Sequence, residues 1–124
     1  MLPAKFLQVL KHEGVVAIAT QGANGRPHLV NTWNSYVQVV PDEQLVIPVG
    51  GMHTTENNVS QNSDILLTGG SREVEGKHGP GTGFLISGHA EFSYAGPEFD
   101  LIKRRLSWVR AALKVAVKEI TQTL

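Results

Sequence analysis

The segment from His28 to Tyr36, His-Leu-Val-Asn-Thr-Trp-Asn-Ser-Tyr, places polar and aromatic side chains side by side. Side chains alternate between the faces of a strand, so both faces here would carry polar groups beside large side chains. A core strand would show one clean apolar face instead. The segment is therefore either an ordinary edge strand or the wall of a ligand site. In the second case Trp33 and Tyr36 supply an apolar surface for a flat ring. The groups available to its polar edge are Asn31, Thr32 and Asn34.

A second segment combines two glycines, Gly50 and Gly51, with the expected start of a helix near Thr54. Glycine lets the backbone approach a ligand closely. The first N–H groups of a helix suit a phosphate, and Thr54 and Thr55 would add hydroxyl donors. Asn58 falls on the same helical face as these threonines. Simple capping of the helix by a threonine explains the pattern equally well, and the P-loop pattern is absent.

Hydrophobic periodicity and turn residues predict the elements that position these segments. Strand and helix signals alternate at short intervals through the first half of the chain. The predicted elements are a helix over 3–12 ended by Gly14 in a left-handed cap, strands over 15–20 and 27–33 around an Asn24-Gly25 turn, a hairpin over 37–40 and 45–49, a helix over 54–61, and a strand over 65–68.

The second half begins with a segment rich in glycine, residues 76–83, which predicts a loop. A long strand over 84–92 follows, with Gly88 as a bulge. Pro97 suits the first turn of a helix that runs to about Leu106. Residues 109–120 carry both helix and strand signals, and we interpret them mainly as a strand. The whole predicts a mainly β fold, an antiparallel β-barrel with a few short peripheral helices.

Length and composition limit the classes of function. The 124 residues suit one domain, 1–124, and the 11 basic and 11 acidic residues give a net charge of zero. No basic stripe or basic amphipathic helix is visible, so neither nucleic acid nor a membrane is an expected partner. No apolar run approaches the roughly 18 residues of a membrane span, and the start lacks the apolar stretch of a signal peptide. We therefore expect a cytoplasmic protein.

Motifs of catalysis and metal binding are missing from the sequence. The chain has no cysteine, which excludes disulfides, thiolate zinc sites and cysteine nucleophiles. Its five histidines show no metal-ligand spacing. There is no Gly-x-Ser-x-Gly and no recognisable nucleophile triad. We accordingly predict no metal site and no catalytic residue.

Taken together, four blocks resemble the FMN-binding split-barrel family, which includes pyridoxamine 5′-phosphate oxidase, and most of all its short bacterial members. The resemblance runs through essentially the whole chain, to Gln122-Thr123-Leu124. It implies a split β-barrel, FMN as cofactor, and a homodimer with two FMN sites at the subunit interface. The blocks are residues 13–20, 28–36, 48–55 and 79–86.

The resemblance also implies a role for individual residues. One side of the flavin would be lined by Asn31, Thr32, Trp33 and Asn34, and its backbone-facing edge held by Pro48, Gly50 and Gly51. The phosphate would meet Thr54, Thr55 and Asn58. Positions near the ring, some from the partner subunit, would be Glu13, Tyr36, Trp108 and Leu124.

One position departs from the family pattern. A close relative has lysine where this chain has Thr54, and that lysine would lie beside the phosphate. The side chains that could compensate are His53, Arg72 and Lys77.

These expectations favour an electron carrier that uses FMN, because no residue is an obvious general acid or base and the flavin itself carries the reaction. Its partner would be a redox protein or a small electron donor that the sequence does not identify. Two alternatives stay open: a flavin-dependent reductase or oxidase, and a flavin-binding module without turnover. Whether the protein is an enzyme is thus undecided at this level.

Overall fold

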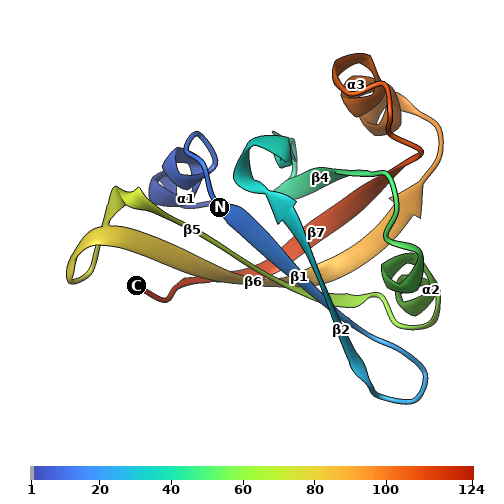
Figure 1. Ribbon diagram of the computed structural model, residues 1–124, viewed down its shortest axis with the longest axis horizontal. Coiled ribbons are helices and arrows are strands. Elements are labelled where there is room, and N and C mark those ends of the chain that lie inside the picture. Colours follow the sequence, from blue (N-terminus) through green and yellow to red (C-terminus); the bar gives the residue numbers. More distant parts are fainter. Residues whose placement is uncertain (1) are drawn as a thin grey trace.

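The computed structural model describes residues 2–124, which form one seven-stranded antiparallel sheet with three short helices at its periphery (Figure 1). The strands are β1 (Val15–Gln21), β2 (Pro27–Trp33), β3 (Gln38–Val40), β4 (Gln44–Val49), β5 (Asp64–Gly76), β6 (Gly79–Ser93) and β7 (Ala111–Gln122). The helices are α1 (Ala4–Val9), α2 (His53–Gln61) and α3 (Pro97–Arg105), with a 3-10 turn, η1 (Asn34–Tyr36), after β2. The predicted mainly β, antiparallel fold is confirmed.

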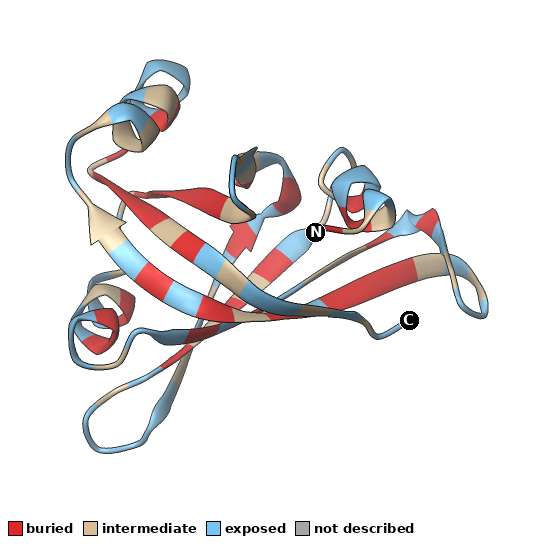
Figure 2. Ribbon diagram, turned by 180° about the vertical axis from the view of Figure 1, so that it is seen from behind, coloured by how far each residue is buried: buried red, intermediate tan, exposed pale blue. Residues whose placement is uncertain are grey.

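The sheet is strongly curved and has the strand order β2-β1-β5-β6-β7-β4-β3. Its concave side encloses the main core, in which alternate side chains of the strands point inward, as the red bands along the strands in Figure 2 show. Phe6 of α1 packs edge-on against Phe84 of β6, with ring centroids 5.6 Å apart. A smaller cluster lies under α3, formed by Val46, Ile102, Val109 and Ala112.

The opposite face of β2, β1, β5 and β6 carries apolar side chains that stay exposed. In the strand register Leu29 lies opposite Ala19, and Ala19 opposite Leu66. Likewise Trp33 lies opposite Val15. We call this surface the outer apolar face, and its members are Val15, Leu29, Trp33, Leu66 and Leu85. Surfaces of this kind on one side of a sheet commonly mark an interface.

Two sequence predictions in the first third of the chain are wrong. Gly14 does not cap α1, which ends at Val9 with Leu10 as a right-handed cap. Instead, a Cβ at Gly14 would lie 2.4 Å from the carbonyl oxygen of Gly70, so glycine is needed there for close approach of two backbones. The strand alternation over 28–36 also fails after Trp33, because η1 turns the chain.

The predicted loop over 76–83 is wrong as well. β5 and β6 form a long hairpin that pairs Gly76 with Gly79, so only residues 77 and 78 make the turn. Gly79 and Gly81 have positive φ of 123° and 109°, and the ladder shifts register between Ser71 and Glu75. The glycines therefore serve a twisted, irregular strand pair instead of a loop. The ladder of β6 and β7 shifts register beside Gly88, where we predicted a bulge, but the extra residue is Lys118 of β7, because Ser87 pairs with Glu119 and Gly88 with Val117.

Candidate functional site

Asn34 anchors the chain where β2 ends. Its side chain is completely buried, and Nδ2 donates to the carbonyl oxygens of Val9 at 3.2 Å, His12 at 3.1 Å and Gly70 at 3.0 Å. The backbone N–H of Asn34 also donates to Gly14 O. These bonds fix η1 against α1 and β5, so the amide nitrogen is already in use inside the protein. Tyr36 takes its position from this anchor.

Tyr36 pairs with Trp108, which follows α3. The ring centroids are 5.8 Å apart and the planes are tilted by 47°. Trp108 also covers Gly50, where a Cβ would come within 3.1 Å of the indole ring. Half of the Trp108 surface is still exposed, and the space at Gly51 is open. We call the group of Tyr36, Trp108, Gly50 and Gly51 the ring corner.

Arg110 holds the two glycines of the ring corner in place. Its Nε donates to Gly50 O at 2.8 Å and its Nη2 to Gly51 O at 2.6 Å. The same guanidinium pairs with Glu56 of α2 at 2.9 Å, and the Tyr94 hydroxyl donates to that carboxylate. Hydrogen bonds from Arg110 and then from Tyr94 lower the pKa of Glu56 below its ordinary value. Charge-assisted bonds of this kind are stronger than neutral ones, so the turn is rigid.

No pattern in the sequence predicts this clamp. Arg110 stands between an aromatic residue and an apolar run, and Glu56 looks like an ordinary helical carboxylate. A carboxylate near the start of a helix is favoured by the helix dipole, which explains Glu56 without any partner. Only the pairing of β7 with β4 brings Arg110 beside the glycines.

The threonines lie within the first turn of α2 instead of capping it. The N-cap is Met52, in the left-handed conformation with φ of 57°, and no side chain caps the helix. The capping interpretation of the threonines is therefore wrong. Thr54 is exposed, whereas Thr55 is fully buried and its Oγ1 has no hydrogen-bond partner within residues 2–124. The first N–H groups of a helix likewise lack helical partners, so this end offers donors to an anion.

Thr54 and Asn58 border a cavity of about 300 Å³ between α2 and the turn that joins β1 to β2. Asn58 is 6% exposed, and its Nδ2 donates to Thr20 Oγ1 of β1 at 3.2 Å. We call this the hairpin cavity. Its other lining residues are Gly22, Asn24, Arg26, Pro27 and His28, none of which we predicted as site residues from the sequence.

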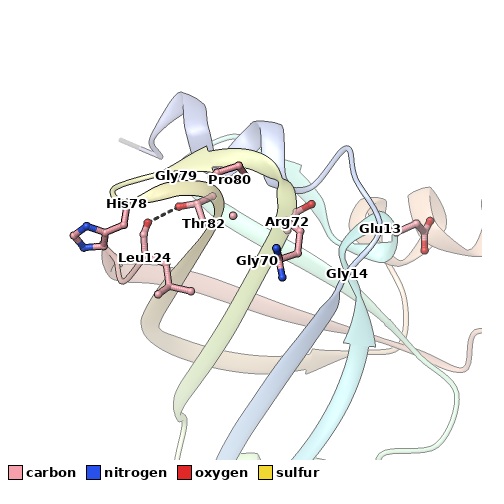
Figure 3. Close-up of a pocket in the computed structure, with 11 residues that line it drawn as sticks. Glu13, Gly14, Gly70, Arg72, His78, Gly79, Pro80, Thr82 and Leu124 are labelled. Atoms are coloured by element: carbon pink, nitrogen blue, oxygen red, sulfur yellow. Dashed lines mark hydrogen bonds between the residues drawn. The ribbon is translucent and has the colours of Figure 1, made fainter.

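Glu13 and Leu124 border a different cavity, of about 540 Å³, beside the long β5–β6 hairpin. Figure 3 shows them at opposite ends of it, with Arg72 between them. The Leu124 carbonyl oxygen accepts hydrogen bonds from Thr82 Oγ1 and Gln122 Nε2, each at 2.8 Å. The terminus is thus fixed in place.

The remaining predicted residues divide by face. Asn31 and Trp33 are exposed on the outward side of β2, and Thr32 is buried on its inward side. Pro48 is also buried, on the face of β4 that it shares with Val46 of the cluster under α3. One chain therefore brings together the ring corner and the start of α2, but leaves Trp33 on the outer apolar face and Leu124 in a separate cavity. No group of acidic or histidine side chains that could hold a metal occurs within residues 2–124. Nor does that part of the chain contain a helix long and apolar enough to cross a membrane.

The curved antiparallel sheet and its peripheral helices define a split-barrel protein. The family model of pyridoxamine 5′-phosphate oxidase matches residues 2–123, and the chain belongs to that family. Among its relatives, the FMN-binding protein of Nitratidesulfovibrio vulgaris (strain DSM 19637 / Miyazaki F) is 59% identical over 124 residues, which are 100% of both chains.

Solved structures share the fold at much lower identity. A variant of HupZ from Group A Streptococcus superposes with a TM-score of 0.82 at 18% identity, over 99% of this chain and 100% of that one. An FMN-binding protein from Syntrophomonas wolfei gives 0.72 at 14% identity, over 88% and 76% of the two chains. The split-barrel fold predicted from the sequence is confirmed.

Proposed function

We propose that this protein binds FMN between two copies of the chain and acts as an electron carrier. The observation that carries the proposal is the ring corner beside the start of α2: an aromatic, partly open surface next to free helical N–H groups. A flavin mononucleotide needs these two environments at its two ends. The relative that is 59% identical along its full length is named for FMN binding.

The groups at the start of α2 fit a phosphate. Thr55 Oγ1 is buried with no partner in residues 2–124, and a buried hydroxyl left unsatisfied costs free energy. A phosphate oxygen at the start of the helix would give such a donor an acceptor. The N–H groups of the first turn point toward the same end. The ring would lie by Gly51, where the backbone is accessible, and by Trp108.

A dimer accounts for the residues that one chain leaves apart. Leu29 is 69% exposed, Trp33 48% and Leu66 47%, an apolar surface that a second copy would cover. Trp33 and Asn31 on this surface would then line the flavin at the interface. Glu13 and Leu124 would approach the ring from one subunit or the other. The Asn34 side chain, being fully buried, would act by positioning η1.

The dimer is tested with Leu66→Glu, which places a charge on the outer apolar face. Light scattering should show a monomer, and the flavin should be lost with the dimer. The matched control is Val39→Glu, because Val39 is a similarly exposed residue, 42%, on the distant edge strand β3. A Leu66→Glu protein that remains a dimer would contradict the proposed interface.

The ring corner also favours a carrier over an enzyme. Bound FMN supplies the transfer of electrons or hydride. Glu56 is the carboxylate nearest in sequence to the glycine turn, and it is engaged by Arg110 and Tyr94. It therefore holds the turn in place instead of offering a free base to a substrate. The alternative is a flavin-dependent reductase or oxidase, which would accept hydride from a nicotinamide cofactor.

The purified protein should be yellow, with FMN near one per chain identified after release. Stopped-flow mixing then separates the functions. Slow bleaching by NADH or NADPH, with rapid reduction through a redox partner protein, supports the carrier. Rapid bleaching by the nicotinamide alone supports the enzyme. A colourless protein that also fails to bind added FMN would refute flavin binding.

A further inference from the structure

The hairpin cavity contains two basic side chains that are not among the predicted site residues. Arg26 and His28 line it, opposite Thr54 and Asn58 of α2. Arg26 follows the turn between β1 and β2, and Figure 1 shows this turn lying beside α2. The position that carries lysine in a close relative, Thr54, thus lies across the cavity from an arginine.

The turn is fixed against α2. The backbone N–H of Ala23 donates to Gln61 Oε1 at 3.1 Å, and Asn58 bonds to Thr20 at the end of β1. Within the turn, the N–H of Arg26 donates to Asn24 Oδ1 at 3.0 Å. The Arg26 backbone therefore has a defined place relative to the first turn of the helix, while its side chain is exposed.

The guanidinium of Arg26 is available for a ligand. It has no hydrogen bond or ion pair within residues 2–124, and no lining residue of the cavity is acidic. A cation facing only neutral and basic groups beside a helix N-terminus creates a positive potential with no internal counter-charge. Such a site suits an anion with several acceptor oxygens, and a guanidinium binds phosphate with two parallel hydrogen bonds.

The other basic side chains near this region are already engaged or lie elsewhere. His53 faces Arg110 at 3.3 Å and Glu56 at 3.9 Å. Lys77, in the turn of the long β5–β6 hairpin, donates to the Gln122 carbonyl oxygen of β7. Arg72 lines the cavity of Glu13 and Leu124. None of these compensating side chains that the sequence suggested borders the hairpin cavity.

We propose that Arg26 recognises the phosphate of the bound flavin, in place of a lysine at position 54, and so sets the preference for FMN over riboflavin. The inference rests on the proposed FMN site and assigns it a residue from a different element. A cation on the β1–β2 turn reaches the phosphate from the side opposite to α2, so the anion lies between the helix N-terminus and the guanidinium.

The test compares FMN and riboflavin affinities of the wild-type protein and Arg26→Gln at low and high salt. Arg26→Gln should weaken FMN binding by about tenfold at low salt and leave riboflavin binding unchanged within about twofold. The loss of FMN affinity should become smaller as salt rises, because the pair formed by the Arg26 guanidinium and the phosphate is exposed to solvent. Arg104→Gln is the matched control: it removes the same charge from an exposed site on α3 and should change neither affinity.

A second variant separates the charge from the turn. Thr54→Lys introduced into Arg26→Gln should restore most of the lost FMN affinity, since either cation can face the phosphate. Unchanged FMN affinity in Arg26→Gln would overturn the inference while leaving FMN binding intact, and so would an equal loss for both flavins. A wild-type protein that binds neither flavin would overturn the proposed function and this inference with it.

Discussion

The ring corner and the hairpin cavity lie at the two ends of one proposed site, but they are built in opposite ways. At the ring corner Arg110 occupies the carbonyl oxygens of Gly50 and Gly51 and pairs with Glu56. In the hairpin cavity, by contrast, Arg26 has no side-chain partner within residues 2–124. At the ring corner the charged side chains bind one another and the backbone. In the hairpin cavity the charge of Arg26 is available to a ligand. Shape recognition and charge recognition are thereby separated.

The largest effect should follow from breaking the Arg110 clamp. Arg110→Gln removes bonds to two carbonyl oxygens and leaves Glu56 without its cation, a loss of about 1.5–3 kcal/mol for each charged contact. Because the glycine turn would lose its fixed shape, FMN and riboflavin should both bind at least about tenfold more weakly. Isothermal titration with both ligands measures this. Arg110→Lys retains the charge but not the planar guanidinium with its several donors, so its flavin affinities should lie between those of the wild type and Arg110→Gln. A loss of affinity confined to FMN would contradict the clamp.

Removal of an aromatic surface should have the next largest effect. Trp33→Ala should weaken binding by about 1–3 kcal/mol if Trp33 packs against the ring from the dimer interface. Bound flavin should also quench its fluorescence. The loss should be equal for FMN and riboflavin, since both have the same ring. Unchanged affinity for both ligands would return Trp33 to the role of an ordinary edge-strand residue.

The phosphate end can be sharpened by adding a charge. Thr54→Lys should increase FMN affinity by about tenfold, the lower end of what a charge-assisted hydrogen bond supplies once side-chain ordering is subtracted. Riboflavin affinity should not change, and the gain should fall with salt. If Arg26 already serves the phosphate, the gain in the wild type should be smaller than in Arg26→Gln. Equal gains for both flavins would mean that the lysine acts on the ring or the fold.

The smallest effect concerns pH and belongs to the ring corner. The pKa of Glu56 lies below its ordinary 4.5 because Arg110, and then Tyr94, hydrogen-bond to the carboxylate. Between the unfolded pKa and the lower folded pKa of Glu56, the unfolded chain therefore binds more protons than the folded one, and stability falls as pH falls. The contribution, at most about 1 kcal/mol, is present in full above the unfolded pKa and is lost as pH falls through the lowered folded value.

Thermal unfolding of the wild type and of Glu56→Gln, measured from neutral pH down through the pKa of Glu56, tests whether stability falls as pH falls. The wild type should be the more stable protein at neutral pH, and the two melting curves should converge in acid. A difference that grows as pH falls would show that Glu56 does not stabilise the clamp as a carboxylate. Arg104→Gln again serves as a control for a change in net charge.

Local patterns were sufficient for most of the elements. Hydrophobic periodicity and turn residues predicted β1 and the second part of β6, Pro97 marked the start of α3, and Gly88 marked the place where the β6–β7 ladder shifts register. These features depend on residues close in sequence, which is why they can be read there. Residues 76–83 failed because glycine and proline favour turns locally, whereas long-range pairing of β5 with β6 overrides that preference.

The sequence by itself determined the fold class, the family resemblance and the two segments around which the proposed site is built. It could not show that the Asn34 side-chain amide donates hydrogen bonds to the carbonyl oxygens of Val9, His12 and Gly70. Nor could it show that Gly14 allows a close backbone contact instead of capping a helix. Nor could it bring Arg110 to Gly50 or Arg26 to Thr54. Those pairs are separated by many residues, and their interaction depends on distance and direction in space. Only the paired strands decide which charges meet a partner inside the protein and which remain free for a ligand.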